Sequence, residues 1–362
     1  MKNFLFALGH PAHFHLYKNT ISELIKREHS VSIVISDKDI LKNLLDNHRL
    51  KYFVIAEKKN KEGVIKKLFK LISSSFELNR IVRKLKPDLI IGCLTQIGII
   101  GWWNKIPTIF NAEDDIDYTY LQAILVYPFI KHIVMPIPTN VSIFKKKKIG
   151  YDGYQKLSYL HPNWFVSDYK KIEYPENVFF ILRVAKLKAY HDLNITGLSD
   201  EIILKIISVL KDRGRILITS ERSLPRDVEK YIYKGKIEDI HHYLAFADMY
   251  IGDSQSMAVE AAILGTPGIR FNKFAGKISI LEELEKKYEL TTSIDSSEPE
   301  KLFKTIETML NSNNLKQDYS NRRDKMLNEK IDVTKFFIWL IENYPKSILE
   351  MKNNPPIQYQ IK

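Results

Sequence analysis

The stretch "YIGDSQSMAVEAAILGTPGIRFN" (residues 250–272) contains a strand, a helix and a second strand in immediate succession. "YIGD" is a short apolar strand, and a helix is predicted from about Ser256. Gly265-Thr266-Pro267 ends this helix, and "GIRF" then returns as a strand. The order is typical of an α/β fold with a parallel sheet.

The beginning of this predicted helix is a candidate anion site. Backbone N–H groups at a helix start have no intrahelical partner and lie at the positive end of the helix dipole, which suits a phosphate. Ser254 and Ser256 add hydroxyls there, and Glu260 follows about one turn later, where its carboxylate can accept hydrogen bonds from a ribose. A plain capped helix with a surface glutamate is the alternative.

The same alternation of strands and helices extends through the chain. Near-continuous apolar strands are predicted at "NFLFAL", "SVSIVIS", "KYFVIA", "DLIIGC", "PTIFNA", "IVMPIP", "VFFILRV" and "RILITS". Helices are predicted between them, the first at "KNTISELIKREH", and the pattern favours parallel sheets covered on both faces. The rhythm stops and restarts near residue 170. We therefore expect two doubly wound domains, 1–168 and 169–325, followed by a C-terminal helix and tail at 326–362.

Composition limits the class of protein. The 362 residues suggest two domains, and 45% hydrophobic with 27% charged residues excludes wholesale disorder. The single cysteine, Cys93, excludes a disulfide framework and cysteine-based structural zinc. The first apolar run is too short for a signal peptide, and no run approaches a membrane-spanning helix, so a cytoplasmic protein is expected. The net charge of +12 favours an anionic partner, but no nucleic-acid motif appears, and we expect no nucleic-acid partner.

Three histidines follow the first predicted strand in "GHPAHFH" (9–15): His10, His13 and His15. A histidine near neutral pKa can deprotonate a hydroxyl, can cap or pack a helix, or can bind a metal. No cluster of Asp, Glu or Cys accompanies these histidines in the sequence, which argues against a metal site.

Two further segments place charge at predicted strand ends, where ligands bind in open α/β sheets. "NAEDDID" (111–117) brings Glu113 and Asp114, with a solvated helix start as the alternative. "RVAKLKAYHD" (183–192) brings cations that suit a phosphate or an acidic sugar, with a basic surface loop as the alternative. These cations are Arg183, Lys186, Lys188 and His191, and Ser220 in "SERS" is a weaker phosphate contact.

A helix at "EGVIKKLFKLISSSF" (62–76) combines an apolar stripe with Lys66, Lys67 and Lys70. Such a helix can lie on an anionic membrane leaflet. A core-facing amphipathic helix with a solvated basic face is the alternative.

"DSQSMAVEAAILGTPGIR" resembles the nucleotide-sugar motif of GT-B-fold proteins, the superfamily of many glycosyltransferases and of the UDP-GlcNAc 2-epimerases. "GHPAHFH", "YDGYQKLSYLHPNWF" and "RVAKLKAYHDLNITGLSDE" join it in resembling the bacterial and archaeal domain of unknown function three-five-four, a GT-B family, over about residues 1–325. The resemblance implies two Rossmann-like domains facing a cleft, with the acceptor on the first and a UDP-linked sugar donor on the second. Ser254, Gln255, Ser256 and the Met257 backbone would hold the donor diphosphate, Glu260 the ribose, with Arg183, Lys186 and Ser220 also on the donor side.

The resemblance also implies roles in the first domain. His13 matches a catalytic histidine, with His10, His15 and Asp114 on the acceptor side, and neither a metal nor a further cofactor is expected. Glu113 matches a catalytic glutamate of the epimerases. However, Cys93 stands where they have an aspartate, and their His-Arg-X-Glu-Asn loop is absent, which weighs against epimerisation.

The sequence therefore predicts a nucleotide-sugar-dependent glycosyltransferase, moving a hexosyl or N-acetylhexosaminyl group. We expect it to build a bacterial surface glycan on a lipid carrier at the inner face of the plasma membrane. An epimerase or hydrolase of the same fold, or a non-catalytic glycan- or nucleotide-binding protein, are the alternatives, because fold alone does not decide among them.

Overall fold

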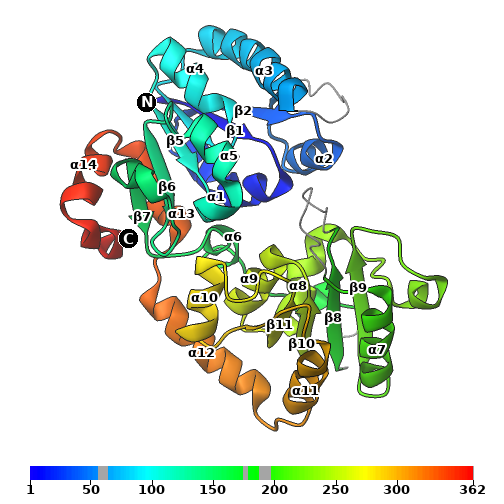
Figure 1. Ribbon diagram of the computed structural model, residues 1–362. Helices are drawn as coiled ribbons and strands as arrows, with labels where there is room; N and C mark the ends of the chain where they lie inside the picture. The colour runs from blue at the N-terminus through cyan, green and yellow to red at the C-terminus, as the bar shows by residue number, and fades with distance from the viewer. Residues whose placement is uncertain (56–63, 174–177, 187–196, 362) are drawn as a thin grey trace. The chain divides into compact units, whose positions relative to one another are not determined.

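The computed structural model describes residues 1–55, 64–173, 178–186 and 197–361, with the backbone alone over 64–72. The chain divides into two compact units: unit 1 is Met1–Tyr159 with Ile331–Lys362, and unit 2 is Leu160–Lys330. In each unit, helices surround a parallel sheet (Figure 1). The predicted α/β class with two Rossmann-like domains is confirmed.

Unit 1 is built on a seven-stranded parallel sheet of order β3-β2-β1-β4-β5-β6-β7. Its strands are β1 (Asn3–Leu8), β2 (Ser30–Ser36), β3 (Phe53–Ile55), β4 (Leu89–Gly92), β5 (Thr108–Asn111), β6 (His132–Pro136) and β7 (Lys148–Tyr151). Its helices are α1 (Pro11–Lys26), α2 (Asp39–Asn47), α3 (Val64–Leu85), α4 (Gln96–Asn104), α5 (Ile116–Val126), α13 (Val333–Glu342) and α14 (Lys346–Asn353), with 3₁₀ helices η1 (Ser142–Lys147) and η5 (Pro355–Gln360).

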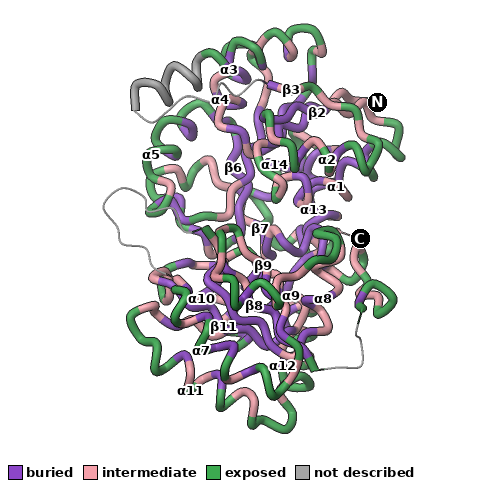
Figure 2. Tube along the Cα trace, turned by 90° about the vertical axis from the view of Figure 1, so that its right-hand side faces the viewer, coloured by how far each residue is buried: buried purple, intermediate pink, exposed green. Residues whose placement is uncertain are grey.

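Alternation along the strands of unit 1 separates two cores. Leu5 and Ala7 of β1 pack with α3, α4 and α5. Phe6 of β1 points to the other face, where its ring meets Tyr17 of α1, and Tyr17 in turn meets Phe337 of α13. Figure 2 shows the strands as buried tubes and much of the outer helical surface as exposed.

Unit 2 has a five-stranded parallel sheet of order β12-β11-β10-β8-β9. Its strands are β8 (Phe179–Val184), β9 (Arg215–Ser220), β10 (Met249–Gly252), β11 (Gly268–Phe271) and β12 (Thr292–Ile294). Its helices are α7 (Asp200–Leu210), α8 (Ile240–Phe246), α9 (Gln255–Leu264), α10 (Ser279–Lys286), α11 (Pro299–Leu310) and α12 (Leu315–Glu329), with 3₁₀ helices η2 (Tyr169–Lys171), η3 (Arg226–Tyr231) and η4 (Ile237–Asp239). The short helix α6 (Leu157–Leu160) lies at the division between the units.

Several boundaries differ from the sequence predictions. α1 begins at Pro11, inside the histidine-rich segment that the sequence suggests is a loop, because Pro at the first helical position and the His10 side chain start the helix there. The chain divides after Tyr159 and not after residue 168. Residues 331–362 belong to unit 1, because α13 packs on α1, so they are not a separate tail. The basic residues Lys66, Lys67 and Lys70, and also Lys188 and His191, have side chains outside the described residues.

Glycine is required at one sheet position. Gly92 ends β4 with φ of 154°, and a Cβ there would lie 2.1 Å from the carbonyl oxygen of Ala7 in β1. The adjacent strands therefore approach closely at their carboxyl ends, at the edge that carries the candidate site.

Gly92→Ala is expected to lower the free energy of unfolding by more than about 3 kcal/mol, because two strands must separate to admit the methyl group. Gly276→Ala is the matched control, since Gly276 also has positive φ (73°) but no described atom lies within 4 Å of the place that a methyl group would take. The control should cost only about 1 kcal/mol. Urea denaturation of both variants measures the difference, and equal losses would contradict the close approach.

Candidate functional site

In unit 1, the carboxyl ends of β1, β4 and β5 lie side by side, because these strands are adjacent and parallel. The segments that follow them carry His13, Cys93 and Glu113. The tertiary structure adds Lys156, a residue that the sequence motifs did not single out. We call His13, Cys93, Glu113 and Lys156 the unit 1 cluster.

His13 lies in the first turn of α1, and its ring is oriented by the backbone. The N–H of Gly9 donates to Nδ1 of His13 at 3.0 Å, which leaves the proton of the neutral ring on Nε2. Burial, followed by the positive groups His10, Lys38 and Lys156, lowers the pKa of His13 to about 3. His13 is therefore a neutral imidazole that presents an N–H donor.

The neighbouring histidines have local partners. Nδ1 of His10 accepts the N–H of Ala12 at 3.2 Å and caps α1, so the helix-capping alternative applies to His10. Lys38 fixes the preceding turn by donating from Nζ to the carbonyl of Gly9 at 2.7 Å. His15 packs against Tyr159, with ring centroids 5.4 Å apart.

Glu113 is an ion-paired carboxylate. Its Oε2 contacts Nζ of Lys156, its Oε1 accepts the N–H of Gln155 at 2.9 Å, and both charged side chains are 11% exposed. Asp114, next in the chain, is exposed, and partial removal from water followed by the Glu113 charge raises its pKa. Of these two carboxylates, Glu113 is the one that its partners hold in a fixed position.

Near this pair lies a group of buried and half-buried polar side chains. Burial raises the pKa values of the Cys93 thiol and of the Tyr17 and Tyr151 hydroxyls, and the charge of Glu113 adds to the rise for Cys93 and Tyr151. The amide of Asn111 is 1% exposed, and neither of its polar atoms has a partner among the described residues. The side-chain amide of Asn111 can therefore form its hydrogen bonds with water or with a ligand.

In unit 2, α9 begins directly after β10 at the carboxyl edge of the sheet. Ser254 is its N-cap, and its Oγ accepts the N–H of Met257 at 3.4 Å. The N–H groups of Gln255 and Ser256 in the first turn have no intrahelical partner. The open donors are thus those of Gln255 and Ser256, whereas the Met257 amide is already capped. Gly265, at φ of 77°, ends the helix as predicted.

Glu260 is paired within unit 2. Its Oε1 lies 3.3 Å from Nε2 of His241 in α8, and both side chains are 13% exposed. His242, the next residue, turns elsewhere and accepts the N–H of Asp168 at Nδ1, 3.0 Å away. Glu260 is the candidate residue for binding a ribose, and His241 is its partner. The sequence did not reveal His241, because α8 and α9 meet only in the folded unit.

The cationic candidates have partners too. Arg183 contacts Oε1 of Glu221, whose Oε2 accepts the N–H of Lys186 at 3.1 Å. The Lys186 side chain is exposed. Ser220 donates to the carbonyl of Arg222 at 2.7 Å in a local turn. Among the candidates whose side chains the structure describes, Lys186 is the one that presents its charge at the surface.

Asp253 organises this edge, and no sequence signal pointed to it beyond its place in "YIGD". Its Oδ1 accepts the N–H of Ala185 at 2.7 Å and its Oδ2 that of Leu198 at 3.1 Å. Burial raises its pKa against these hydrogen bonds. Asp253 therefore ties the segments that follow β8 to the start of α9.

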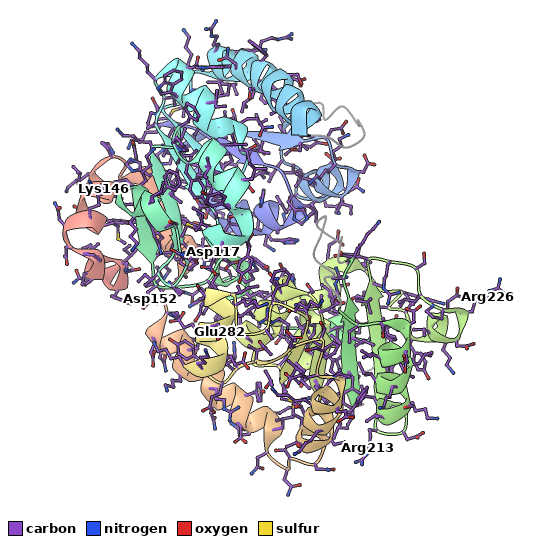
Figure 3. The ribbon with its side chains drawn as sticks, viewed as in Figure 1. Asp117, Lys146, Asp152, Arg213, Arg226 and Glu282 are labelled. Carbon is purple, nitrogen blue, oxygen red and sulfur yellow. The ribbon has the colours of Figure 1, made fainter. Side chains whose placement is uncertain are left out.

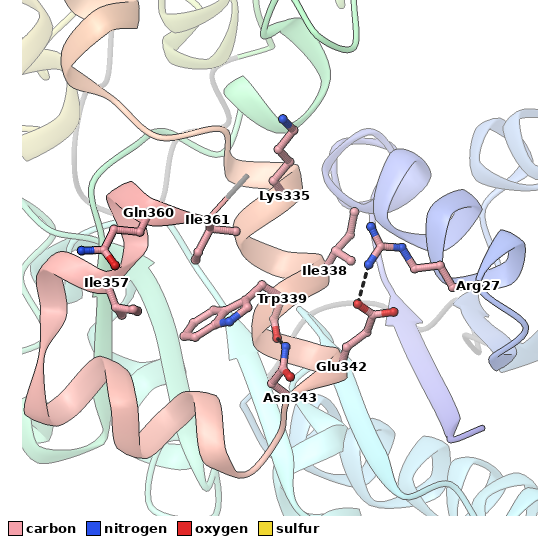
Figure 4. Close-up of a pocket in the computed structure, with 9 residues that line it drawn as sticks. All are labelled: Arg27, Lys335, Ile338, Trp339, Glu342, Asn343, Ile357, Gln360 and Ile361. Atoms are coloured by element: carbon pink, nitrogen blue, oxygen red, sulfur yellow. Dashed lines mark hydrogen bonds and ion pairs between the residues drawn. The ribbon is translucent and has the colours of Figure 1, made fainter.

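Other features lie apart from these groups. A hollow of about 390 Å³ in unit 1 lies between α13 and η5, lined by Trp339, Ile338 and Ile357 beside the Arg27–Glu342 ion pair (Figure 4). It contains none of the predicted site residues. Among the described residues, His, Cys, Asp and Glu form no group of three that could hold a metal ion. Within the same part of the chain, no helix is both long and apolar enough to span a bilayer.

No family model and no curated protein matches the chain. Solved structures match nearly all of it. The UDP complex of MnaA from S. aureus is 12% identical with a TM-score of 0.70, covering 97% of this chain and 98% of that one. UDP-GlcNAc 2-epimerase from Neisseria meningitidis, bound to UDP-GlcNAc, is 15% identical with a TM-score of 0.64, covering 96% and 100%. MurG from Acinetobacter baumannii is 15% identical with a TM-score of 0.60, covering 94% and 99%.

The chain has the GT-B fold. Two parallel-sheet Rossmann-like units and the likeness to these structures establish it. Identities of this size show the fold alone, and the resemblance to the domain of unknown function three-five-four stays a prediction.

His13 makes stability depend on pH. The folded state protonates this ring only near pH 3, whereas an unfolded histidine does so near 6.5. The unfolded state thus binds more protons below about pH 6.5, and the free energy of unfolding should fall as the pH drops from there.

His132, whose pKa burial lowers to about 4, contributes with the same sign. His13→Asn keeps an acceptor for the Gly9 N–H but removes the titrating ring, so it should reduce the loss of stability between about pH 7 and pH 5. His132→Asn should remove a separate part of this pH-dependent loss of stability. Urea unfolding at several pH values measures both, and an unchanged pH dependence in the His13 variant would refute a ring that stays neutral in the folded state.

Proposed function

We propose that this protein is a glycosyltransferase that uses a nucleotide sugar, with a UDP-linked hexose or N-acetylhexosamine as donor. The acceptor is a growing bacterial surface glycan on a lipid carrier, met at the cytoplasmic face of the plasma membrane. The observation that carries the proposal is the edge of the unit 2 sheet, where open helix N–H groups and a half-buried carboxylate one turn later lie together in a GT-B fold.

In this proposal the donor diphosphate rests on the first turn of α9. The amides of Gln255 and Ser256 point along the positive end of the helix dipole, and the hydroxyls of Ser254 and Ser256 add donors. The Met257 amide joins them if the phosphate displaces the Ser254 cap. Lys186 adds positive charge. Arg183 would leave Glu221, and Ser220 would leave the Arg222 carbonyl, to bind phosphate oxygens instead.

In this proposal the carboxylate of Glu260 accepts hydrogen bonds from the two ribose hydroxyls. A carboxylate suits this task because it is an acceptor only, with room for two donors. His241 holds one of its oxygens in place, so the other is oriented before the ligand arrives. This preorganisation lowers the ordering cost of binding.

The proposed reaction is displacement at the anomeric carbon, with the diphosphate leaving on the α9 terminus. The two catalytic candidates of unit 1 take different tasks. The sequence predicts His13 as the base, but a ring with its proton on Nε2 and a pKa of about 3 suits a hydrogen-bond donor to an acceptor or phosphate oxygen better. Glu113 is then the group that receives the acceptor proton. His10, His15 and Asp114 remain proposed acceptor-side residues.

Epimerisation is the less favoured alternative. It requires an acid and a base to remove and return a proton, and by the resemblance Cys93, a half-buried thiol whose pKa is raised, stands where the epimerases have an aspartate. The unit 1 cluster contains a single carboxylate, Glu113, and an ion pair with Lys156 holds it. Glu113 at the end of β5 is the observation that keeps an epimerase or hydrolase in consideration.

A panel of nucleotide sugars, with and without lipid-linked acceptor, tests the function. Acceptor-dependent release of nucleotide is expected, and chelators should leave it unchanged, since the proposed mechanism uses no metal or further cofactor. Conversion of the nucleotide sugar without acceptor would identify an epimerase or hydrolase instead. Binding without any turnover would identify a binding protein.

Glu260→Gln should weaken UDP binding by about 5–150-fold, since losing a charged hydrogen-bond acceptor costs about 1–3 kcal/mol. The fold should survive, because Glu260 lies in a partly exposed position. Glu300→Gln, an exposed glutamate at the start of α11, is the matched control and should bind UDP as the parent does. Calorimetry measures both affinities, and equal values in the two variants would refute the ribose assignment.

Replacements of His13 separate a donor from a base. Gln can place an amide N–H near the position of Nε2, whereas Ala and Asn cannot. Turnover should fall about 10²–10³-fold in His13→Ala and His13→Asn, and less in His13→Gln. If His13 acted as a base, all three replacements would lower turnover equally, because none of them can take up the proton. UDP affinity should change far less than turnover, since most of the proposed donor contacts lie in unit 2. Near-parent turnover in His13→Ala would leave the ring a structural role only.

A further inference from the structure

The outward side of α5 is apolar. Tyr120 and Leu121 are 62% and 64% exposed, and Ile124 and Leu125 are exposed as well. Of this helix only Ile116, Ala123 and Val126 are buried. A surface helix normally turns polar residues to the solvent. α5 has instead the composition of a helix that is covered on both sides.

The apolar surface continues onto the neighbouring helices, since α4 packs on both α3 and α5. Trp102 of α4 is 65% exposed, and its ring lies 5.8 Å from that of Phe129, just after α5. Trp103 lies 5.9 Å from Phe76 of α3, which is 62% exposed. We call the exposed side chains of α4 and α5, with Phe76 and Phe129, the α4–α5 surface.

Basic residues adjoin this surface. Arg80 follows Phe76 by one turn of α3, Lys105 directly follows α4, and Lys131 follows Phe129 by two residues; all three are exposed. Nζ of Lys147 donates to the carbonyls of Tyr127, Pro128 and Ile130 at 2.6–2.9 Å.

Lys147 thus holds η1 beside the end of α5, and η1 carries the exposed Lys145 and Lys146 (Figure 3). Asp117, at the other end of α5, accepts a hydrogen bond from Nδ2 of Asn140 at 3.2 Å (Figure 3). The charge around the carboxyl end of α5 is positive.

We propose that the α4–α5 surface docks on an anionic lipid bilayer. Trp and Tyr are the aromatic residues enriched at the interface between membrane and water, and Phe, Leu and Ile between them would enter the acyl boundary. The surrounding Lys and Arg side chains meet anionic headgroups, each contributing about fivefold to binding. Phe76 lies on the same helix, α3, as the predicted basic segment 62–72, whose side chains lie outside the described residues, and the other members of the surface lie on and after α4 and α5.

A bilayer fits the charge better than a second copy of the chain does. In a two-fold dimer the same patch meets itself, so these basic residues would be brought towards one another. An anionic leaflet attracts all of them. The inference deepens the proposed function, because a lipid-linked acceptor lies in such a leaflet. Its purpose rests on that function, but its observations do not use the donor site.

The test uses the full chain and vesicles of phosphatidylglycerol with phosphatidylcholine. The parent should sediment with these vesicles, more weakly as salt rises, and little with pure phosphatidylcholine. Trp102→Glu and Leu121→Glu should each lower the partition coefficient about tenfold or more, because an apolar anchor becomes an anion. Both positions are exposed, so folding should be unaffected.

Ile237→Glu is the matched control, since Ile237 is 77% exposed but lies in unit 2. It should bind vesicles as the parent does. Lys131→Gln should lower binding about fivefold. No binding of the parent, or equal loss in the Ile237 control, would overturn the proposal. So would a parent dimer that Leu121→Glu dissociates while vesicle binding stays unchanged, which would identify a second copy as the occupant.

UDP calorimetry on the same variants keeps the two proposals separate. Trp102→Glu and Leu121→Glu should bind UDP as the parent does. A parent that sediments with anionic vesicles but binds no nucleotide would refute the donor site and leave the docking surface standing. A parent that binds UDP but no vesicle would do the reverse.

Discussion

The parallel direction of all strands in each sheet is the constraint on which the candidate sites depend. Because every strand runs the same way, each carboxyl end lies at one edge, and the segments that leave these ends are brought together. In unit 1 this gathers "GHPAH", "GC" and "NAE" from three adjacent strands. In unit 2 it places β8, β9 and β10 so that Arg183, Ser220 and the start of α9 share one edge. Gly92 shows the cost of this arrangement, since no side chain fits where β4 meets β1.

The two edges have different chemistry. The unit 1 cluster is a half-buried network, in which the ion pair between Glu113 and Lys156 lies near the Cys93 thiol and the buried Tyr151 hydroxyl. Low solvent access makes each of these groups sensitive to its neighbours, which is why the pKa of His13 falls so far. The unit 2 edge is open: helix N–H groups without intrahelical partners lie beside Glu260, and Asp253 fixes the backbone around them. Such a division suits reaction chemistry on one unit and ligand binding on the other.

The α4–α5 surface reflects a different physical demand. An apolar side chain in water loses the free energy that burial would give it, so a helix with an apolar outer side is stabilised by a covering partner. The partner that we infer is an anionic leaflet, which would cover the exposed rings and also pair with the lysines. Lys147 illustrates how the structure uses one lysine of the "KKKK" run for itself, capping the carbonyls at the end of α5, and leaves Lys145 and Lys146 at the surface.

Local features of the sequence determined much of the fold. The apolar runs predicted the strands β1 to β6 and β8 to β11, and Gly265 predicted the end of α9, because strand burial and helix capping depend on neighbouring residues. They missed β7 and β12, which are short and lie at sheet edges, and they began α1 too late, since the Pro11 start was hidden among residues that suggested a loop. The start of α9 and the position of Glu260 were also readable, because their spacing lies within one helix.

Only the tertiary structure decided which distant residues meet. Glu113 pairs with Lys156 and Glu260 with His241, and neither pair follows from spacing along the chain. It also decided that Nδ1 of His13 accepts a backbone N–H, which leaves the proton of the neutral ring on Nε2. Residues 331–362 joined unit 1 because α13 packs on α1, across nearly the whole chain length. Hydrogen bonding, ion pairing and burial act through space, so a sequence that fixes its local elements by pattern leaves the protonation and partners of its site to the packing of those elements.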